Sequence, residues 1–161
     1  MFKVGDKIVY PLHGAGTIES IESKKVLGEA KDYFVLKLPV RNMKVMLPLD
    51  NVHNLGLRNI EDAEQLDEVY EVLAQEASDM SSNWNRRYRD NMEKVRTGDI
   101  CEVATVVRDL MIMDSEKGLS TGEKKMLNNA KQILISEIAM INDYEWSDAE
   151  KTIDEIVAKV S

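Results

Sequence analysis

The stretch DYFVLKL, residues 32–38, carries the strongest strand signal in the chain. Aromatic and β-branched residues fill it, and such residues are enriched in strands because they pack well on a pleated surface. Pro39 follows directly and is expected to end the strand, since proline has no amide hydrogen for ladder pairing. The first part of the 161-residue chain is therefore expected to form a sheet around this stretch.

Weaker strand signals flank it on both sides. Several short strands at close spacing predict a small barrel, which we place at residues 1–60. Alternation along residues 43–47 turns Val45 and Leu47 inward and Met46 outward. An outward methionine on an edge strand suits protein docking, although singly exposed apolar residues are also normal on ordinary surfaces. The flanking strands are predicted at residues 7–10, 17–22 and 43–47, with turns at residues 11–16, 27–30 and 41–42.

The composition switches after about residue 60, where proline disappears and the apolar period becomes helical. The chain is thus expected to be α+β: the small barrel, followed in residues 61–161 by an all-α bundle of about five helices. The third of these carries the broadest apolar face and is expected to be central. The predicted helices cover residues 62–77, 83–96, 100–114, 120–142 and 147 onward, with start signals at Asp62 with Gln65, at Asn83, at Asp99, and at the capping boxes Ser120/Glu123 and Ser147/Glu150.

The start of the second predicted helix, NWNRRYR at residues 83–89, combines an indole with three arginines. Arginines hold phosphates and a flat ring can stack on or wedge beside a base, so the group suits nucleic acid. The alternative is that Trp84 belongs to the core, because it begins an apolar stripe at helical spacing. Lys124 and Lys125, one turn into the fourth helix, either extend this phosphate-binding surface or form a solvated face. The candidate contact residues are Trp84, Arg86, Arg87, Arg89, Lys124 and Lys125.

Charge is unevenly distributed along the chain. The net charge is −8, yet residues 84–98 hold five bases against two acids, whereas residues 61–82 hold eight acids and no base. Such segregation permits a local basic face on an acidic molecule. It also predicts modest affinity for nucleic acid, so a second partner is needed to bring the protein to its site.

Several function classes find no support in the sequence. Two histidines and one cysteine, Cys101, are too few and too scattered for a metal site, and Cys101 is expected to be a small buried hydrophobe. No phosphate-cradling glycine motif or nucleophile motif occurs, and His13 is interpreted as a turn residue bonded to the local backbone. We therefore expect no enzyme activity, metal or cofactor. Without a long apolar run or an export signal, no membrane association and a cytoplasmic location are expected.

Four separated motifs resemble the CarD/CdnL family of bacterial transcription regulators. The likeness covers nearly the whole chain with the motifs in order. The motifs are FKVGDKIVYPLHGAG at residues 2–16, NWNRRYR at 83–89, VVRDL at 106–110 and GLSTGEKKML at 118–127.

The resemblance implies that residues 1–60 form a Tudor-like domain that docks on the RNA polymerase β subunit, and that residues 61–161 form a helical DNA-binding domain. Trp84 would lie in the minor groove at the upstream edge of the transcription bubble and stabilise the open promoter complex. The family's basic positions fall on the three arginines and Lys124. The expected DNA-contacting residues are Trp84, Arg86, Arg87, Arg89, Lys124 and Lys125. The expected polymerase interface comprises Lys24, Val26, Lys44, Met46 and Pro48.

Two other functions remain open at the level of sequence. One is a protein–protein adaptor that binds polymerase without touching DNA, and the other is an RNA-binding module. The sequence does not fix the oligomeric state, for which a monomer is the expectation.

Overall fold

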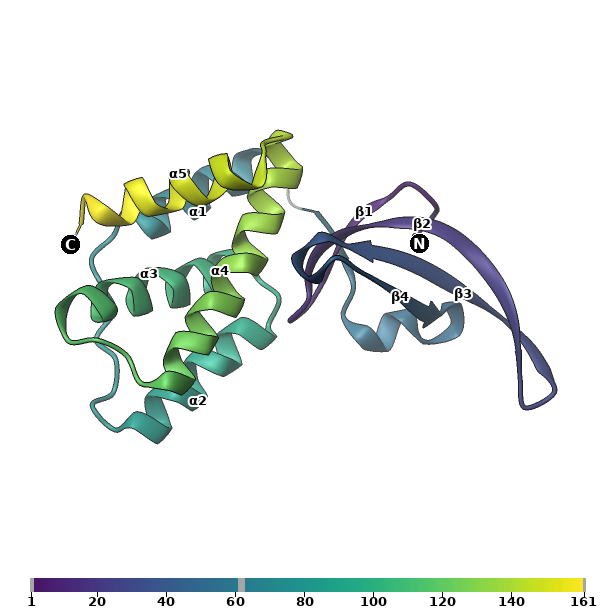
Figure 1. The fold of residues 1–161 in the computed structure, drawn as a ribbon, viewed down its shortest axis with the longest axis horizontal. Coiled ribbons are helices and arrows are strands. Elements are labelled where there is room, and N and C mark those ends of the chain that lie inside the picture. The colour runs from purple at the N-terminus through teal and green to yellow at the C-terminus, as the bar shows by residue number, and fades with distance from the viewer. Residues whose placement is uncertain (1, 61–62, 161) are drawn as a thin grey trace.

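The computed structural model describes residues 2–60 and 63–160. It places a curved β-sheet beside a bundle of helices, so the expected α+β order is confirmed (Figure 1). The start signal at Asp62 and the boundary between residues 60 and 61 involve residues outside the described ranges. No described helix is both long enough and apolar enough to cross a membrane.

The first domain is a five-stranded antiparallel sheet in the order β4-β3-β2-β1-β5. Ile8, Ile18, Leu36 and Leu38 form the centre of its core and are fully buried. The fold is the Tudor-like arrangement expected from the sequence, and between the described residues no pairing joins β4 to β5. The strands are β1 (Lys7–Tyr10), β2 (Gly14–Val26), β3 (Glu29–Leu38), β4 (Met43–Pro48) and β5 (Arg58–Asn59), with 3-10 helices η1 (Pro39–Arg41) and η2 (Leu49–Leu55) on either side of β4.

The β2–β3 hairpin is longer than the sequence predicts. Val26 pairs with Glu29, which leaves only Leu27 and Gly28 as the turn. Both turn residues have positive φ, 53° and 82°, as hairpin turns of two residues often require. The hairpin tip therefore extends beyond the rest of the sheet (Figure 1).

The edge strand β4 follows the predicted alternation. Leu47 is buried and Val45 packs against the sheet core, whereas Met46 is half-exposed. Because β4 pairs with β3 alone among the described residues, its outer edge is open.

Within residues 63–160, the second domain has five α-helices around a common apolar core. The helix α3 is central, as expected, because it packs against each of the other four. The apolar residues predicted to face inward on this helix, from Ile100 to Leu110, are buried. The helices are α1 (Ala63–Leu73), α2 (Trp84–Arg96), α3 (Ile100–Glu116), α4 (Thr121–Asn142) and α5 (Trp146–Ala158).

Two helix boundaries differ from the prediction. The helix α1 ends at Leu73 rather than Ala77. Arg108 donates to the Val72 carbonyl at 2.9 Å, and the segment after the helix is held by hydrogen bonds between Ser78 and the Arg108 and Asp109 side chains. The helix α5 begins at Trp146, so the predicted capping box at Ser147 is wrong.

The earlier start of α5 has a clear origin in its first turn. The amides of Asp148 and Ala149 both donate to the Glu145 carbonyl, so Ser147 is already inside the helix. Trp146 packs partly against the bundle core, and this contact holds the chain where the helix begins.

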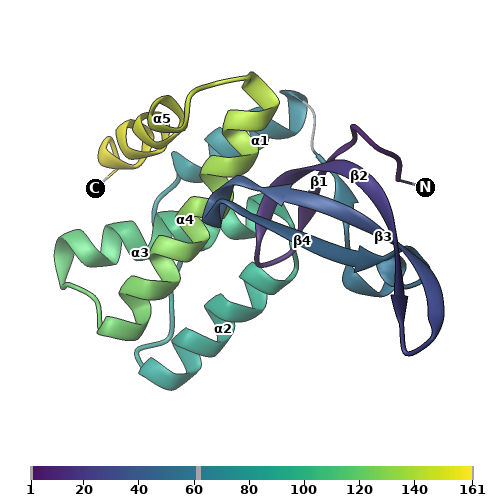
Figure 2. The same ribbon diagram turned by 45° about the vertical axis from the view of Figure 1, so that its right-hand side comes forward.

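The longest helix, α4, also forms the boundary with the first domain. It packs against β2 and η1 on one side and against α3 on the other, an arrangement that both views show (Figures 1 and 2). The helix α4 therefore carries a large part of the contacts between the two domains.

Candidate nucleic-acid interface

Trp84 lies on the surface at the first position of α2. Asn83 caps this helix as predicted, because its side-chain oxygen accepts a hydrogen bond from the Arg86 amide at 3.0 Å. The indole is 42% exposed. The alternative that Trp84 is a core residue is therefore excluded, although Val95 at the other end of the same stripe is buried.

The exposed indole is nevertheless held in one orientation. Its Nε1 donates a hydrogen bond to the Ser120 hydroxyl at 2.8 Å. Its ring stacks on Tyr88 with 5.3 Å between centroids and 23° between planes, and a Cβ added at Gly122 would lie 3.5 Å from it. The indole thus contacts the amino-terminal ends of both α2 and α4.

Arg87 has a different role from its neighbours. Its guanidinium makes two hydrogen bonds to the Glu123 carboxylate, at 2.7 and 3.1 Å, and one to the Ser81 carbonyl at 3.1 Å. Only 11% of its side chain is exposed. The expectation that Arg87 contacts phosphate directly is revised for this reason, since its donors are already directed into the protein.

Glu123 connects this ion pair to the indole. The Ser120 hydroxyl donates to one Glu123 oxygen at 3.1 Å and accepts from the Glu123 amide at 3.2 Å, so the predicted capping box is present. Hydrogen bonds from Arg87 hold the pKa of the Glu123 carboxyl below its ordinary value, with Ser120 adding to the effect and burial opposing it. The carboxylate is therefore ionised at neutral pH and neutralises Arg87 internally.

Four other cations near the starts of α2 and α4 are exposed to solvent. Arg86, Arg89, Lys124 and Lys125 are all exposed, and Arg86 makes only a 4.0 Å contact with Asp90. Because Trp84 joins the starts of α2 and α4, the structure brings these residues into one region. They add exposed positive charge near the starts of these two helices, whereas residues 61–82 hold eight acids and no base.

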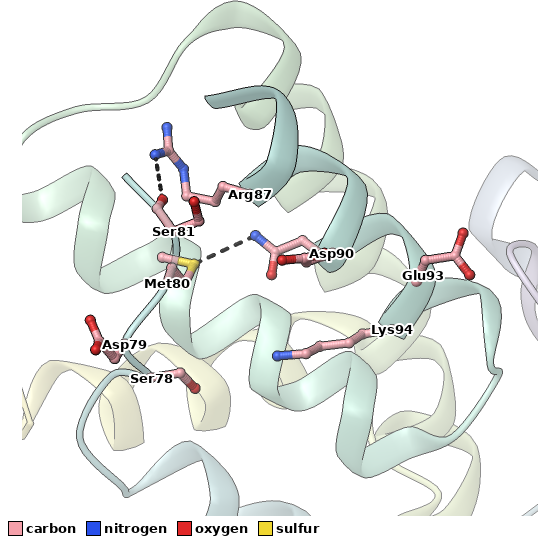
Figure 3. A pocket seen from close by; sticks show the side chains of 9 residues that line it. Ser78, Asp79, Met80, Ser81, Arg87, Asp90, Glu93 and Lys94 are labelled. Carbon is pink, nitrogen blue, oxygen red and sulfur yellow. Dashed lines mark hydrogen bonds between the residues drawn. The ribbon is translucent and has the colours of Figure 1, made fainter. Parts of the chain in front are cut away.

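A polar cleft of about 370 Å³ lies beside α2, between this helix and residues 78–81 (Figure 3). Asp79, Asp90 and Glu93 line it together with Lys94 and the inner side of Arg87. Three carboxylates in one cleft disfavour a phosphate. The basic surface around Trp84 is therefore bounded by acidic groups on this side.

The residues expected to face polymerase lie on the other domain. Lys44, Met46 and Pro48 belong to the open edge strand β4, and Lys44 pairs with Glu19 at 3.1 Å. Lys24 and Val26 lie near the tip of the β2–β3 hairpin, and Val26 is 47% exposed. Both groups lie beside the same part of β3. Pro48 pairs with Tyr33 of this strand, and Lys24 pairs with Lys31, two residues away from Tyr33.

A buried pair that sequence reasoning missed explains part of the VVRDL motif. Arg108 and Asp109 are 4% and 0% exposed and make an ion pair at 3.0 Å. Arg108 also donates to the Ser78 hydroxyl at 2.8 Å, and Asp109 accepts from the Ser78 amide at 2.9 Å. Two adjacent charges in an apolar helical stretch were the available signal, and their role is to fix the segment that follows α1.

His13 and Cys101, the residues considered for metal binding or catalysis, both make contacts within the fold. The His13 amide donates to the Tyr10 carbonyl at 2.8 Å, which is the local turn bond expected for it. Cys101 is half-buried rather than fully buried, with Gln65 Nε2 at 3.7 Å from its sulfur. No group of three or more metal-binding side chains occurs within residues 2–60 and 63–160.

Comparisons with known proteins match two separate parts of the chain. Residues 2–61 match the family model for the CarD-like/TRCF RID domain, and residues 68–154 match that for the CarD C-terminal domain. A Bacillus subtilis (strain 168) protein described as "Putative transcription factor YdeB" is 45% identical over 141 residues, which cover 88% of this chain and 92% of that protein. The solution structure of the 72-residue amino-terminal domain of Myxococcus xanthus CarD is 29% identical, with a TM-score of 0.31, covering 37% of this chain and 79% of that domain.

Together, the two family models and the Bacillus subtilis relative define a CarD-like transcription factor. The chain belongs to the CarD/CdnL family.

Proposed function

We propose that the protein binds the RNA polymerase β subunit through its sheet domain and stabilises the open promoter complex through its helical domain. In this proposal Trp84 enters the minor groove at the upstream edge of the bubble. Arg86, Arg89, Lys124 and Lys125 hold the neighbouring phosphates. The protein acts as a monomer in the bacterial cytoplasm, where its polymerase is found.

The observation that carries the proposal is an indole that is exposed and fixed at once. Trp84 presents 42% of its surface to solvent, yet Ser120 and Tyr88 hold its edge and one face. A ring ordered before binding loses little conformational entropy when it inserts between bases. Apolar wedges of this kind favour partly unstacked DNA over closed duplex.

The open edge of β4 supports the polymerase contact. A partner strand can add to such an edge through main-chain hydrogen bonds, while alternate side chains give specificity. Met46 is half-exposed on this strand and offers an adaptable apolar contact. Lys24 and Val26 extend the same surface along the hairpin.

The energetic effect required of the wedge is small. Each 1.4 kcal/mol of preference for the open form raises its population about tenfold relative to the closed form. Contacts to phosphates and to groove shape carry little sequence information. The polymerase therefore supplies the promoter address, and the family member adds stability to the opened DNA.

The central experiment measures the lifetime of open complexes on a weak promoter with and without the protein. Trp84→Ala is expected to abolish the lengthening while leaving the circular dichroism spectrum unchanged. Tyr144→Ala is the matched control, because Tyr144 is an aromatic of similar exposure, 47%, at the other end of α4. A Trp84→Ala variant that folds and still lengthens the lifetime fully would refute the wedge.

Charge reversal distinguishes DNA contact from the adaptor function. The double variant Arg86→Glu, Arg89→Glu is expected to lose the extension of the promoter footprint and to keep its binding to polymerase. If the footprint and the open-complex lifetime are both unchanged, the helical domain acts on another protein instead. Binding to single-stranded RNA in the absence of polymerase would favour the third function.

A further inference from the structure

The boundary between the two domains contains buried polar contacts that neither domain makes by itself. The Ala15 amide in β2 donates a hydrogen bond to the Ser136 hydroxyl in α4 at 2.9 Å, and Ser136 is only 3% exposed. The same hydroxyl donates to the Ile133 carbonyl at 2.6 Å. A backbone donor of the sheet is thereby satisfied by a side chain of the bundle.

An ion pair at the same boundary links three segments. Arg58, in the last strand of the sheet, pairs with Glu137 of α4 at 2.8 Å. Its Nε also donates to the Gly98 carbonyl between α2 and α3 at 2.8 Å. Glu137 is 1% exposed, and Arg58 of the first domain supplies a positive partner to its carboxylate.

Two glycines at this boundary have close side-chain neighbours. A Cβ added at Gly14 would lie 2.7 Å from Val40 Cγ2 and 2.8 Å from the Ser136 hydroxyl oxygen. One added at Gly98 would lie 3.0 Å from Pro11 Cγ. Both glycines have positive φ, 93° and 72°, which side chains disfavour. The contact between the domains therefore favours glycine at position 14 of the first domain and at position 98 of the second.

Buried ion pairs add little net stability compared with apolar packing, but they demand one geometry. We propose that Arg58 and Glu137 are positioning residues that hold the two domains at one angle, so that Trp84 lies at a fixed place relative to β4. This inference rests on the proposed function. When β4 is bound to polymerase, insertion of the indole becomes an intramolecular step whose effective concentration depends on how well the connection spans the two sites.

Separation of the domains would weaken the insertion of the indole without altering either binding surface. The sheet would still present β4, and the bundle would still present Trp84 beside Ser120. A freely pivoting indole would spend only a fraction of its time at the fork, which lowers its apparent affinity by that fraction.

The direct test is NMR backbone relaxation on the full chain. In the parent protein the two domains are expected to share one rotational correlation time. In Arg58→Ala, which leaves the Glu137 carboxylate without its cation, the domains are expected to show two shorter times. Glu137→Gln is the conservative variant, since its amide oxygen can still accept from Arg58, and it is expected to tumble as one body. Lys151→Ala is the control, because it removes an exposed ion pair within α5.

The functional test uses the open-complex lifetime with the same variants. Arg58→Ala is expected to bind polymerase as the parent does. It is expected to need on the order of tenfold more protein to lengthen the open-complex lifetime by the same amount. Glu137→Gln and Lys151→Ala are expected to match the parent. If Arg58→Ala does not fold, Glu137→Ala, which removes the acid rather than stranding it, takes its place in both assays.

The outcomes separate this inference from the function it rests on. If Trp84→Ala loses activity while Arg58→Ala keeps full activity and tumbles as one body, the positioning role is refuted and the wedge stands. If Trp84→Ala keeps full activity, the wedge is refuted, and the relaxation measurement alone decides whether Arg58 and Glu137 fix the domains: two correlation times support it and one overturns it.

Discussion

Replacing Arg87 with methionine is expected to destabilise the protein by about 3–5 kcal/mol, the usual cost of removing one partner from a buried ion pair. The structure sets this magnitude through exposure and geometry. The Arg87 and Glu123 side chains are 11% and 3% exposed and meet at 2.7 Å. Methionine would leave the carboxylate buried without its cation, and it would also leave the Ser81 carbonyl without its donor.

The assay is equilibrium unfolding in urea followed by circular dichroism. With a slope of about 2 kcal/mol per molar urea, the expected loss moves the midpoint down by about 2 M. The double variant Arg87→Met, Glu123→Met is expected to recover much of the loss, since apolar replacement of both partners is often close to neutral. Arg96→Met is the matched control, because Arg96 pairs with Glu93 at 3.5 Å with both side chains at least 60% exposed.

The control is expected to lose less than about 1 kcal/mol, as exposed ion pairs do. A loss of that same size for Arg87→Met would refute the reasoning, because the pair would then behave as a solvated surface contact. Such a result would also restore Arg87 as a candidate phosphate ligand.

Three further predictions concern neighbouring parts of the helical domain. The pKa of Glu123 is lowered in the folded protein. Its contribution to folding stability is therefore present above the unfolded pKa of about 4.3 and is lost as pH falls through the folded value. The stability difference between the parent and Glu123→Gln, measured by urea unfolding across pH, should shrink in acid, and a constant difference would contradict this. Ser120→Ala is expected to cost about 0.5–2 kcal/mol as a lost cap and to shift the Trp84 fluorescence in a Trp146→Phe background, whereas an unchanged spectrum would show that the hydroxyl does not hold the ring. Arg108→Met is expected to cost about 3–5 kcal/mol in the same unfolding assay, because it leaves a buried carboxylate without its partner, and a loss below about 1 kcal/mol would contradict a buried pair.

The sequence predicted the order of the elements well because the signals were local. Proline and glycine marked most of the strand ends, and the caps at Asn83, Asp99 and Ser120 began helices where expected. Each cap depends on an oxygen reaching an amide two or three residues away, so no knowledge of the rest of the fold was needed.

The errors arose where distant residues compete with local preference. Ser147 has the residue type of a cap, but Trp146 packs on the bundle core and the helix begins earlier. The end of α1 was missed, and the segment that follows it is bonded at Ser78 to Arg108 and Asp109, which lie far along the chain. Neither contact leaves a signal within the segment that it changes.

The sequence predicted which residues belong to the candidate site but not the contacts that they make with one another. Alternation and helical spacing left the exposure of Trp84 open, since the same stripe is buried at Val95 and exposed at its other end. The three arginines were indistinguishable in sequence, yet Arg87 differs because Glu123 comes within reach when α2 and α4 meet. The separation of supporting from solvent-facing cations required the packing of two helices.

The open edge of β4 has a consequence for the free protein. An unpaired strand is a template for any second chain, including another copy of itself, and natural proteins commonly guard such edges with lysine. Lys44 is 65% exposed in the middle part of this strand, and like charges brought together by edge-to-edge pairing of two copies would repel. Lys44 can therefore discourage self-association and keep this edge vacant for the proposed contact with polymerase.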